Sequence, residues 1–129
     1  MNPIAACVTG LQHIGVPTND MEKTIEFYKS LGFELALDVM NGEERVCFFK
    51  LAGVCIEAYQ NGEAVGHAGA IDHVALDVKD IYAAWDAVTA AGYVPREPEP
   101  VFLPFWENGV KYFNITGPNC ETVEFSQYL

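Results

Sequence analysis

The sequence predicts an α+β fold made of two similar modules, each running strand–helix–strand–strand–strand. The first observation is that segments 11–17 and 71–77 share one alternating apolar pattern, with a histidine third in each, His13 and His73. The second is a constant offset of sixty residues, which relates these histidines and three further pairs: Asp20 and Asp80, Gly32 and Gly92, Phe33 and Tyr93. The third is that a helical stripe closed by a glycine follows each strand. Together these observations indicate an internal duplication.

Module one is predicted over residues 8–60. The N-terminal run Ile4 to Thr9 is interpreted as an extra edge strand, and strand 11–17 follows it. A helix comes next, and its predicted capping box is Asn19 with Glu22. The apolar residues of this helix recur at helical spacing on one face: Met21, Ile25, Tyr28 and Leu31.

The remaining strands of module one are predicted at 33–40, 44–51 and 54–60. The Asn41-Gly42 dipeptide between the first two is a strong hairpin signal. Residues 61–69 are glycine-rich and read as a linker. Module two, residues 70–129, repeats the order with strand 70–78, helix 80–91, and strands 93–97, 110–116 and 121–127. The loop 98–109 has no counterpart of equal length in module one.

The bulk properties predict one domain, 1–129, and exclude several function classes. A formal net charge of −11, with only seven lysines and arginines, argues against binding to nucleic acid or to an anionic membrane surface. The apolar runs are too short to cross a bilayer. None of the four cysteines forms a CxxC pair, which favours reduced thiols, and a cytoplasmic location is expected because no export signal is recognised.

Glu57 and Glu124 occupy matching positions in the last strand of each module, each on a face set against apolar neighbours. A lone histidine or glutamate on a strand is usually a structural or solvated residue, but here both types recur in step with the duplication. Two imidazoles and two carboxylates without a thiolate suit one divalent ion such as Ni, Zn, Co, Mn or Fe. The predicted metal ligands are therefore His13, Glu57, His73 and Glu124, with positions left open to water or substrate.

Three segments, 11–33, 71–78 and 117–125, closely resemble motifs of the vicinal oxygen chelate superfamily, which includes glyoxalase I. The resemblance extends over essentially the whole chain. It implies two βαβββ modules whose eight strands form a cup-shaped mixed sheet around a metal ion, with helices on the outer face.

The order His13, Glu57, His73, Glu124 matches that of the glyoxalase I ligands. The resemblance thus implies a metal-dependent lyase or isomerase of lactoylglutathione lyase type, acting on a small hydroxy-carbonyl or thiohemiacetal substrate. Its chemistry would be proton transfer through a metal-bound enediolate, with Glu124 as the base and Glu57 as the second carboxylate. It also implies a homodimer, and the sequence is compatible with a site inside one chain or shared between two.

Several residues are candidates for contact with the substrate. Phe105 and Trp106 are interpreted either as an aromatic wall or lid, or as a core plug or dimer contact. Tyr59 and Cys55 share the strand face of Glu57. Glyoxalase I grips the glutathione carboxylates with basic residues, whereas this chain has few in its predicted sheet: Arg45, Lys50, Arg96 and Lys111. Arg45 is the predicted substrate-binding cation.

Two other functions are weighed against this prediction. One is a non-catalytic small-molecule binding protein of the bleomycin-resistance type, a branch that generally lacks the metal ligands. The other is a metal-dependent epimerase or antibiotic-modifying transferase of the same superfamily, which would use the same site on a different substrate. Metal analysis followed by an isomerisation assay with several thiols would separate them.

Overall fold

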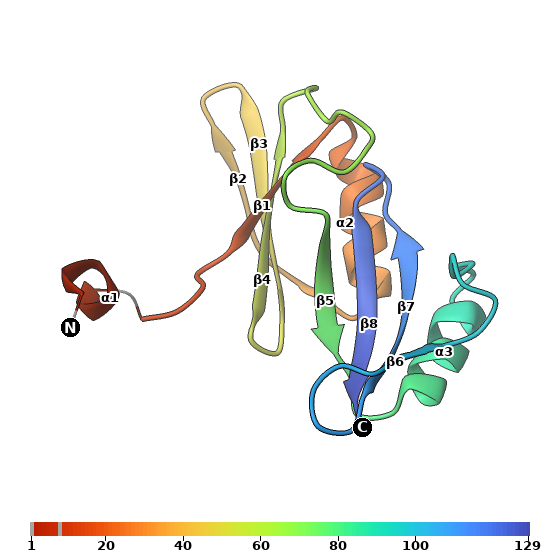
Figure 1. The fold of residues 1–129 in the computed structure, drawn as a ribbon. Helices are drawn as coiled ribbons and strands as arrows, with labels where there is room; N and C mark the ends of the chain where they lie inside the picture. Colours follow the sequence, from red (N-terminus) through yellow and green to blue (C-terminus); the bar gives the residue numbers. More distant parts are fainter. Residues whose placement is uncertain (1, 8) are drawn as a thin grey trace.

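The computed structural model describes residues 2–7 and 9–129 and shows two modules side by side (Figure 1). Module one contains β1 (Ile14–Thr18), α2 (Met21–Ser30), β2 (Glu34–Asn41), β3 (Glu44–Leu51) and β4 (Val54–Gln60). Module two contains β5 (His73–Asp77), α3 (Ile81–Ala90), β6 (Val101–Leu103), β7 (Val110–Thr116) and β8 (Thr122–Tyr128). The predicted α+β architecture of two repeated modules is confirmed.

Each module forms its own four-stranded sheet. The strand order is β1-β4-β3-β2 in sheet A and β5-β8-β7-β6 in sheet B. In both sheets the first strand of the module pairs in parallel with the last, and the other neighbours are antiparallel. The eight strands of one chain are therefore divided between two sheets, and β1 and β5 lie at equivalent edges.

The N-terminal run is a helix, α1 (Pro3–Cys7), rather than the predicted edge strand. It stands away from both sheets at the end of an extended arm (Figure 1). Proline suits the first position of a helix, and the Asn2 side chain accepts a hydrogen bond from the Ala5 backbone N–H at 3.2 Å. Val8, which belongs to the same run, lies outside the described residues.

The predicted strand at 93–97 is also wrong, because the partner of β7 is the short strand β6 at Val101–Leu103. Pro95 interrupts the predicted segment and has no backbone donor. Beside it, the Arg96 N–H donates to the Asn114 carbonyl at 2.9 Å. The Glu97 side chain accepts from the Asn114 N–H at 2.6 Å, so a carboxylate replaces the backbone acceptor that a regular strand would supply.

Both helices begin in the same way. Asp20 and Asp80 are their N-caps, so the predicted cap at Asn19 is one residue early. Gln60 and Gln127, each three residues after the repeated glutamate, accept the first backbone N–H of α2 at 2.7 Å and of α3 at 2.8 Å. The duplication thus extends to the contact that ties each helix to the last strand of its module.

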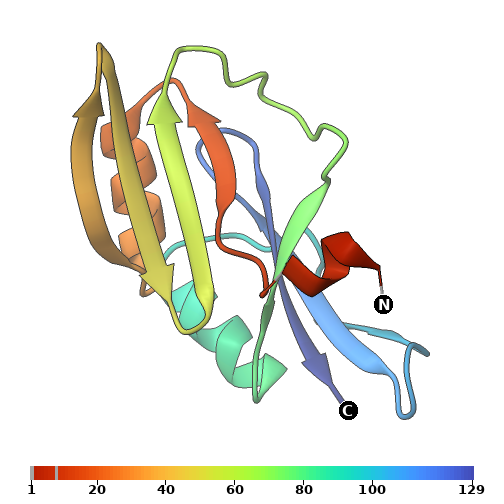
Figure 2. The same ribbon diagram turned by 90° about the vertical axis from the view of Figure 1, so that its left-hand side faces the viewer.

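The helix-covered faces of the two sheets share one apolar core. α2 lies behind sheet A when the sheet is viewed from its open face (Figure 2). The largest fully buried core side chains come from both modules: Phe49, Phe113, Met21, Ile81 and Ile115. A small interior cavity of about 30 Å³ is lined by Val16 and Ile56 of sheet A and by Val74 and Leu76 of sheet B. The inner faces of the sheets therefore point toward a common interior.

Polar contacts also join the modules. The Tyr28 hydroxyl on α2 donates to a Glu121 carboxylate oxygen at 3.0 Å, in the turn between β7 and β8. From the same turn, the Asn119 side-chain amide donates to the Thr24 hydroxyl on α2 at 3.2 Å. These bonds fix the β7–β8 turn against α2 and so set how the two sheets are oriented.

Candidate metal centre

The first pair of predicted ligands meets on sheet A. His13 immediately precedes β1, and Glu57 lies in β4 opposite Gly15 in the parallel register. The His13 Nε2 atom lies 4.0 Å from a Glu57 carboxylate oxygen. The His13 ring also contacts the edge of Phe48 at 5.8 Å between centroids. Both side chains are about one-third exposed or less, so they line the surface without being sealed inside it.

The second pair repeats this arrangement on sheet B. His73 begins β5, and Glu124 lies in β8 opposite Ala75. The His73 Nε2 atom lies 3.5 Å from a Glu124 carboxylate oxygen. The two modules thus form equivalent histidine–glutamate pairs, which we call half-site A and half-site B.

Each histidine is oriented by the residue before it. The Nδ1 of His13 lies 3.0 Å from the Gln12 side-chain oxygen, and the Nδ1 of His73 lies 2.9 Å from an Asp72 carboxylate oxygen. An oxygen acceptor at Nδ1 places the proton there, which leaves Nε2 unprotonated and able to bind a metal. Gln12 and Asp72 are again sixty residues apart. The sixty-residue offset is the sequence signal that identifies this pair.

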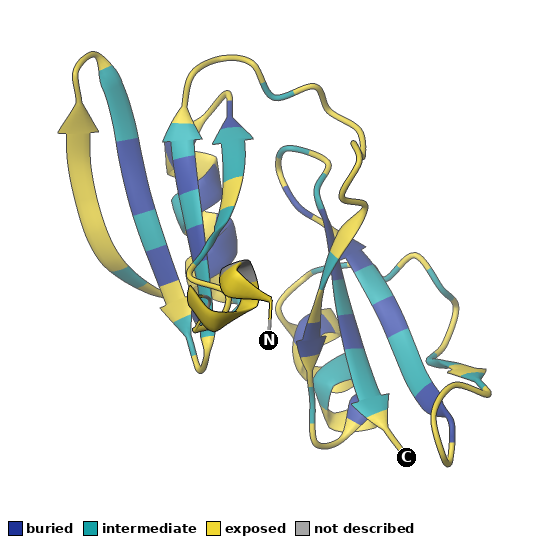
Figure 3. Cartoon of the chain, turned by 60° about the vertical axis from the view of Figure 1, so that its left-hand side comes forward, coloured by how far each residue is buried: buried dark blue, intermediate teal, exposed yellow. Residues whose placement is uncertain are grey.

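The two half-sites lie on the faces of their sheets that the helices do not cover, which we call the outer faces from here on. Ile56 and Val123, each next to a repeated glutamate, belong to the shared core, so strand alternation turns Glu57 and Glu124 away from it. Burial alternates visibly along these strands (Figure 3). Among the described residues no three or more histidine, cysteine or acidic side chains gather in a group that could hold a metal ion. One chain therefore presents two ligands on the helix-free face of each sheet, and within the described residues the two pairs do not come together.

Glu124 differs electrostatically from an ordinary surface carboxylate. Burial raises its pKa, the nearby Glu97 charge adds to the rise, and His73 opposes it. A carboxylate with a raised pKa is a stronger base, which is the property needed to remove a proton from carbon.

The predicted neighbours Tyr59 and Cys55 do lie on the outer face with Glu57, as the strand register shows. A hollow of about 430 Å³ is lined by Glu57, Tyr59 and Phe48, together with residues of the β2–β3 hairpin. The Tyr59 ring crosses the backbone of Gly15, where an added Cβ would lie only 3.3 Å from the ring. A side chain at position 15 would press against the Tyr59 ring, so glycine at this position leaves room for that ring beside half-site A.

Arg45, the predicted substrate-binding cation, does not line this hollow. It lies on β3 three residues from Phe48 and faces α2 instead. Its guanidinium donates to Glu22 of α2 at 2.5 Å and to the Asp38 carboxylate of β2 at 2.7 and 3.0 Å. Both acids are part of an ion-paired cluster on the helix side, so the charge of Arg45 is already neutralised.

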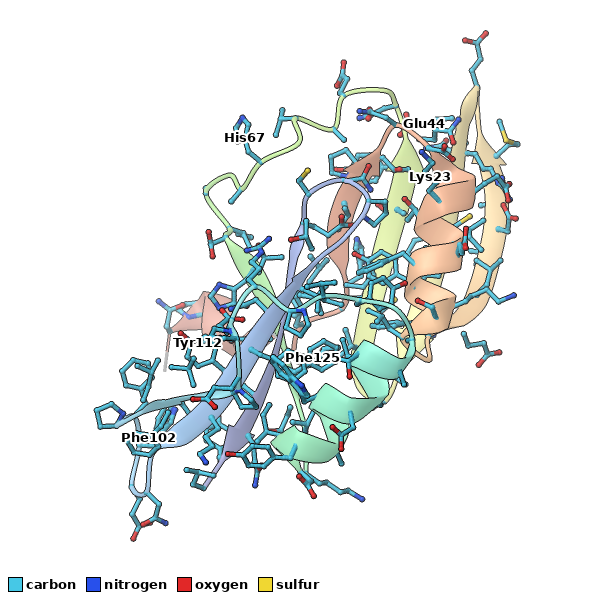
Figure 4. The ribbon with its side chains drawn as sticks, turned by 90° about the vertical axis from the view of Figure 1, so that its right-hand side faces the viewer. Lys23, Glu44, His67, Phe102, Tyr112 and Phe125 are labelled. Carbon is cyan, nitrogen blue, oxygen red and sulfur yellow. The ribbon has the colours of Figure 1, made fainter. Side chains whose placement is uncertain are left out.

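Phe105 and Trp106 also lie away from the half-sites of their own chain. Their loop joins β6 to β7 at the end of sheet B marked by Phe102 (Figure 4). Trp106 is 77% exposed and contacts the edge of Tyr128, four residues along β8 from Glu124. The third histidine, His67, lies on the exposed linker, with Nδ1 on the Ala68 carbonyl at 2.9 Å (Figure 4).

The model of the glyoxalase/bleomycin resistance protein/dioxygenase superfamily matches residues 10–124. The chain belongs to this superfamily. It is 37% identical over 105 residues to a probable lactoylglutathione lyase from Vibrio cholerae, covering 69% of this chain and 72% of the relative. In the described part of this superfamily member, no helix is long and apolar enough to cross a membrane.

Solved structures share the superfamily fold. A glyoxalase family protein from Enterococcus faecalis aligns with a TM-score of 0.77 at 20% identity, covering 92% of this chain and 97% of that one. TnmS3, an antibiotic binding protein from Streptomyces sp. CB03234, aligns with a TM-score of 0.76 at 19% identity, covering 95% and 98%. At these identities the likeness concerns the fold alone.

Proposed function

We propose that this protein is a metal-dependent lyase or isomerase of glyoxalase I type, acting on a small hydroxy-carbonyl or thiohemiacetal substrate. The observation that carries the proposal is the pair of equivalent half-sites, each with a histidine Nε2 within 4.0 Å of a carboxylate oxygen. The similarity to a probable lactoylglutathione lyase supports the same class of reaction.

The residues fit a divalent cation by their chemistry. His13 and His73 each have Nδ1 engaged and Nε2 turned toward a glutamate, and all four donors are nitrogen or oxygen. When bound, such an ion supplies electrostatic stabilisation to two neighbouring substrate oxygens. We infer one ion per complete site.

Glu124 is the proposed base. Its carboxylate lies beside His73 in half-site B, where it could accept a proton from the carbon next to the carbonyl and return it to the neighbouring carbon. Glu57 holds the second carboxylate on the opposite side of the substrate. Phe48 and Tyr59 form the adjoining wall and exclude water from that side of the reacting carbons.

A complete site is proposed to form between two copies of the chain. Because the half-sites of one chain lie on two separate sheets and do not gather into one group among the described residues, we infer that half-site A of one copy meets half-site B of another. A two-fold dimer would then contain two equivalent sites, each with four ligands.

Complementation tests this arrangement. His13→Ala and His73→Ala should each abolish metal uptake and activity, but co-expressed with different tags they should form heterodimers with one intact site. Random assembly makes half of the dimers mixed, so about a quarter of wild-type activity should return. The matched control combines His13→Ala with Glu57→Ala, which damage the same half-site and should restore nothing.

Two results would contradict the proposal. Failure of the His13→Ala and His73→Ala mixture to recover any activity, when mixed dimers are isolated, would rule out a shared site. Wild-type protein that takes up no divalent metal and converts no hemithioacetal of methylglyoxal would rule out the proposed function itself.

A further inference from the structure

The two half-sites differ in one pair of neighbouring side chains. Next to Glu57 in the sheet A register lies Phe48, which pairs in turn with Leu37. Next to Glu124 in sheet B lies Asn114, and its outer neighbour is Glu97. An apolar pair in module one is thus replaced by a polar pair in module two. The two positions are equivalent because both pairs flank a repeated glutamate.

The Glu97 carboxylate holds Asn114 in one orientation. It accepts from the Asn114 backbone N–H at 2.6 Å and from the side-chain Nδ2 at 2.8 Å. Only the amide nitrogen can face a carboxylate in this way, so the Asn114 Oδ1 is turned away from Glu97. Within the described chain no protein group donates a hydrogen bond to that oxygen. Asn114 therefore offers a fixed hydrogen-bond acceptor beside Glu124.

The cations nearest to sheet B are turned to other partners. Lys111 lies on the helix side, where its Nζ donates to the Tyr82 hydroxyl at 2.6 Å. Arg96 donates through Nε to Thr116 at 2.9 Å and lines a hollow with Trp85 of α3. The outer face of sheet B around Glu124 thus combines two carboxylates with an amide oxygen.

A cation is placed differently on sheet A. Lys50 pairs with Cys55 on the outer face, two residues from Glu57. A negatively charged substrate group could therefore find a partner at Lys50, but over sheet B it would meet Glu97 and the acceptor oxygen of Asn114. The two walls of a site shared between chains would then discriminate by charge.

Resting on the proposed function, we propose that Asn114, positioned by Glu97, determines specificity: the substrate presents a hydroxyl or a cationic group to sheet B, not a carboxylate. A hydroxyl would donate to the Asn114 Oδ1, and a cationic group would also be attracted by the Glu97 charge. A carboxylate there would be desolvated without a partner. The net charge of −11 acts in the same direction on approach of the substrate.

Binding of three hydroxamates to the metal-loaded protein tests this inference by calorimetry. They share one chelating group and differ only in the tail, which carries a trimethylammonium, a hydroxyl or a carboxylate. The first two should bind at least about tenfold more tightly than the third. The double variant Glu97→Leu/Asn114→Phe, which copies the module one pair, should reduce the difference to about twofold or less.

Glu97→Gln removes the charge and also one acceptor: its amide oxygen can accept from the Asn114 backbone N–H, but its amide nitrogen then faces the Asn114 side chain and favours turning Oδ1 toward it. It should therefore weaken binding of the trimethylammonium tail by about fivefold or more and weaken binding of the hydroxyl tail as well. The control is Glu26→Gln, which removes the same charge from the exposed face of α2. All variants are compared at equal metal content.

Equal binding of all three tails to the wild type, or tightest binding of the carboxylate tail with loss of that preference in Lys50→Met, would overturn the inference. An unchanged preference in the double variant would also overturn it. If the protein takes up metal and turns over hemithioacetals, such results refute the specificity alone. If no metal is taken up and no hydroxamate binds, the proposed function fails as well.

Discussion

Tyr28→Phe tests the contact that sets the orientation of the two modules. The Tyr28 side chain is 3% exposed, and its hydroxyl donates to Glu121 across the module boundary at 3.0 Å. Phenylalanine keeps the ring contacts with Phe27, Phe33 and Phe49 and removes only the hydrogen bond.

The expected loss of stability follows from the type of hydrogen bond that the substitution removes. A hydrogen bond to a charged partner contributes about 1.5–3 kcal/mol, and the lower end applies because Glu121 is only partly buried and keeps the Asn119 N–H. The variant should therefore be less stable by about 1.5 kcal/mol at pH 7. For a chain of this size the corresponding drop in Tm is about 3–6 °C.

The stability difference should shrink at high pH. Burial, the Glu121 charge and the hydrogen bond raise the pKa of Tyr28 above its ordinary value. The unfolded phenol loses its proton near pH 10 while the folded one keeps it, so the stabilisation is complete below about pH 10 and is lost as pH rises further. The wild type should lose about 1.4 kcal/mol per pH unit more than the variant in that range.

Urea unfolding followed by tryptophan fluorescence at pH 7 and pH 10.5 measures both effects. Tyr128→Phe, at a residue 63% exposed, is the matched control and should change stability by less than about 0.5 kcal/mol. Equal stability of Tyr28→Phe and wild type at pH 7, or parallel curves above pH 10, would refute the role assigned to this contact.

Three further outcomes are expected. Glu124→Gln should reduce turnover by about a hundredfold or more while metal content changes by less than about twofold, and unchanged turnover would exclude Glu124 as the base. Burial first, and then Asp38, raises the pKa of the Cys47 thiol to about 11. Iodoacetamide at pH 8 should therefore modify exposed Cys120 much faster than Cys47, and peptide mass mapping would reveal the opposite order. Gln127→Ala should cost about 1 kcal/mol in denaturant unfolding by leaving the first N–H of α3 without its acceptor, and an unchanged midpoint would show that water replaces it.

Strand alternation made the faces of the site predictable. A period of two residues places Glu57 with Tyr59 and Cys55 on one face, and the structure shows that face turned outward. The same period places Glu124 opposite the buried Val123 and Phe125. That the four repeated side chains bind a metal stays a prediction.

The side of the sheet on which Arg45 lies could not be predicted from the local sequence. Its orientation follows from the register of β3 against β4, in which Phe48 lies opposite Glu57. A shift of one residue would reverse it, and nothing in the sequence of β3 itself fixes that register. The pairing of Glu97 with Asn114 likewise depends on the position of β6, which lies at Val101–Leu103 and not at the predicted 93–97. Local propensity did not indicate this position.

The sequence by itself determined the duplication, the α+β class and the residues that recur in step, because these depend on period and spacing along the chain. Only the tertiary structure decided that the ligands are grouped as two pairs, one on the helix-free face of each sheet. The physical reason is that each sheet has one apolar face, and the chain buries both against a common core. That packing depends on contacts between distant residues, such as Tyr28 with Glu121, and it turns the histidines and glutamates of each module outward.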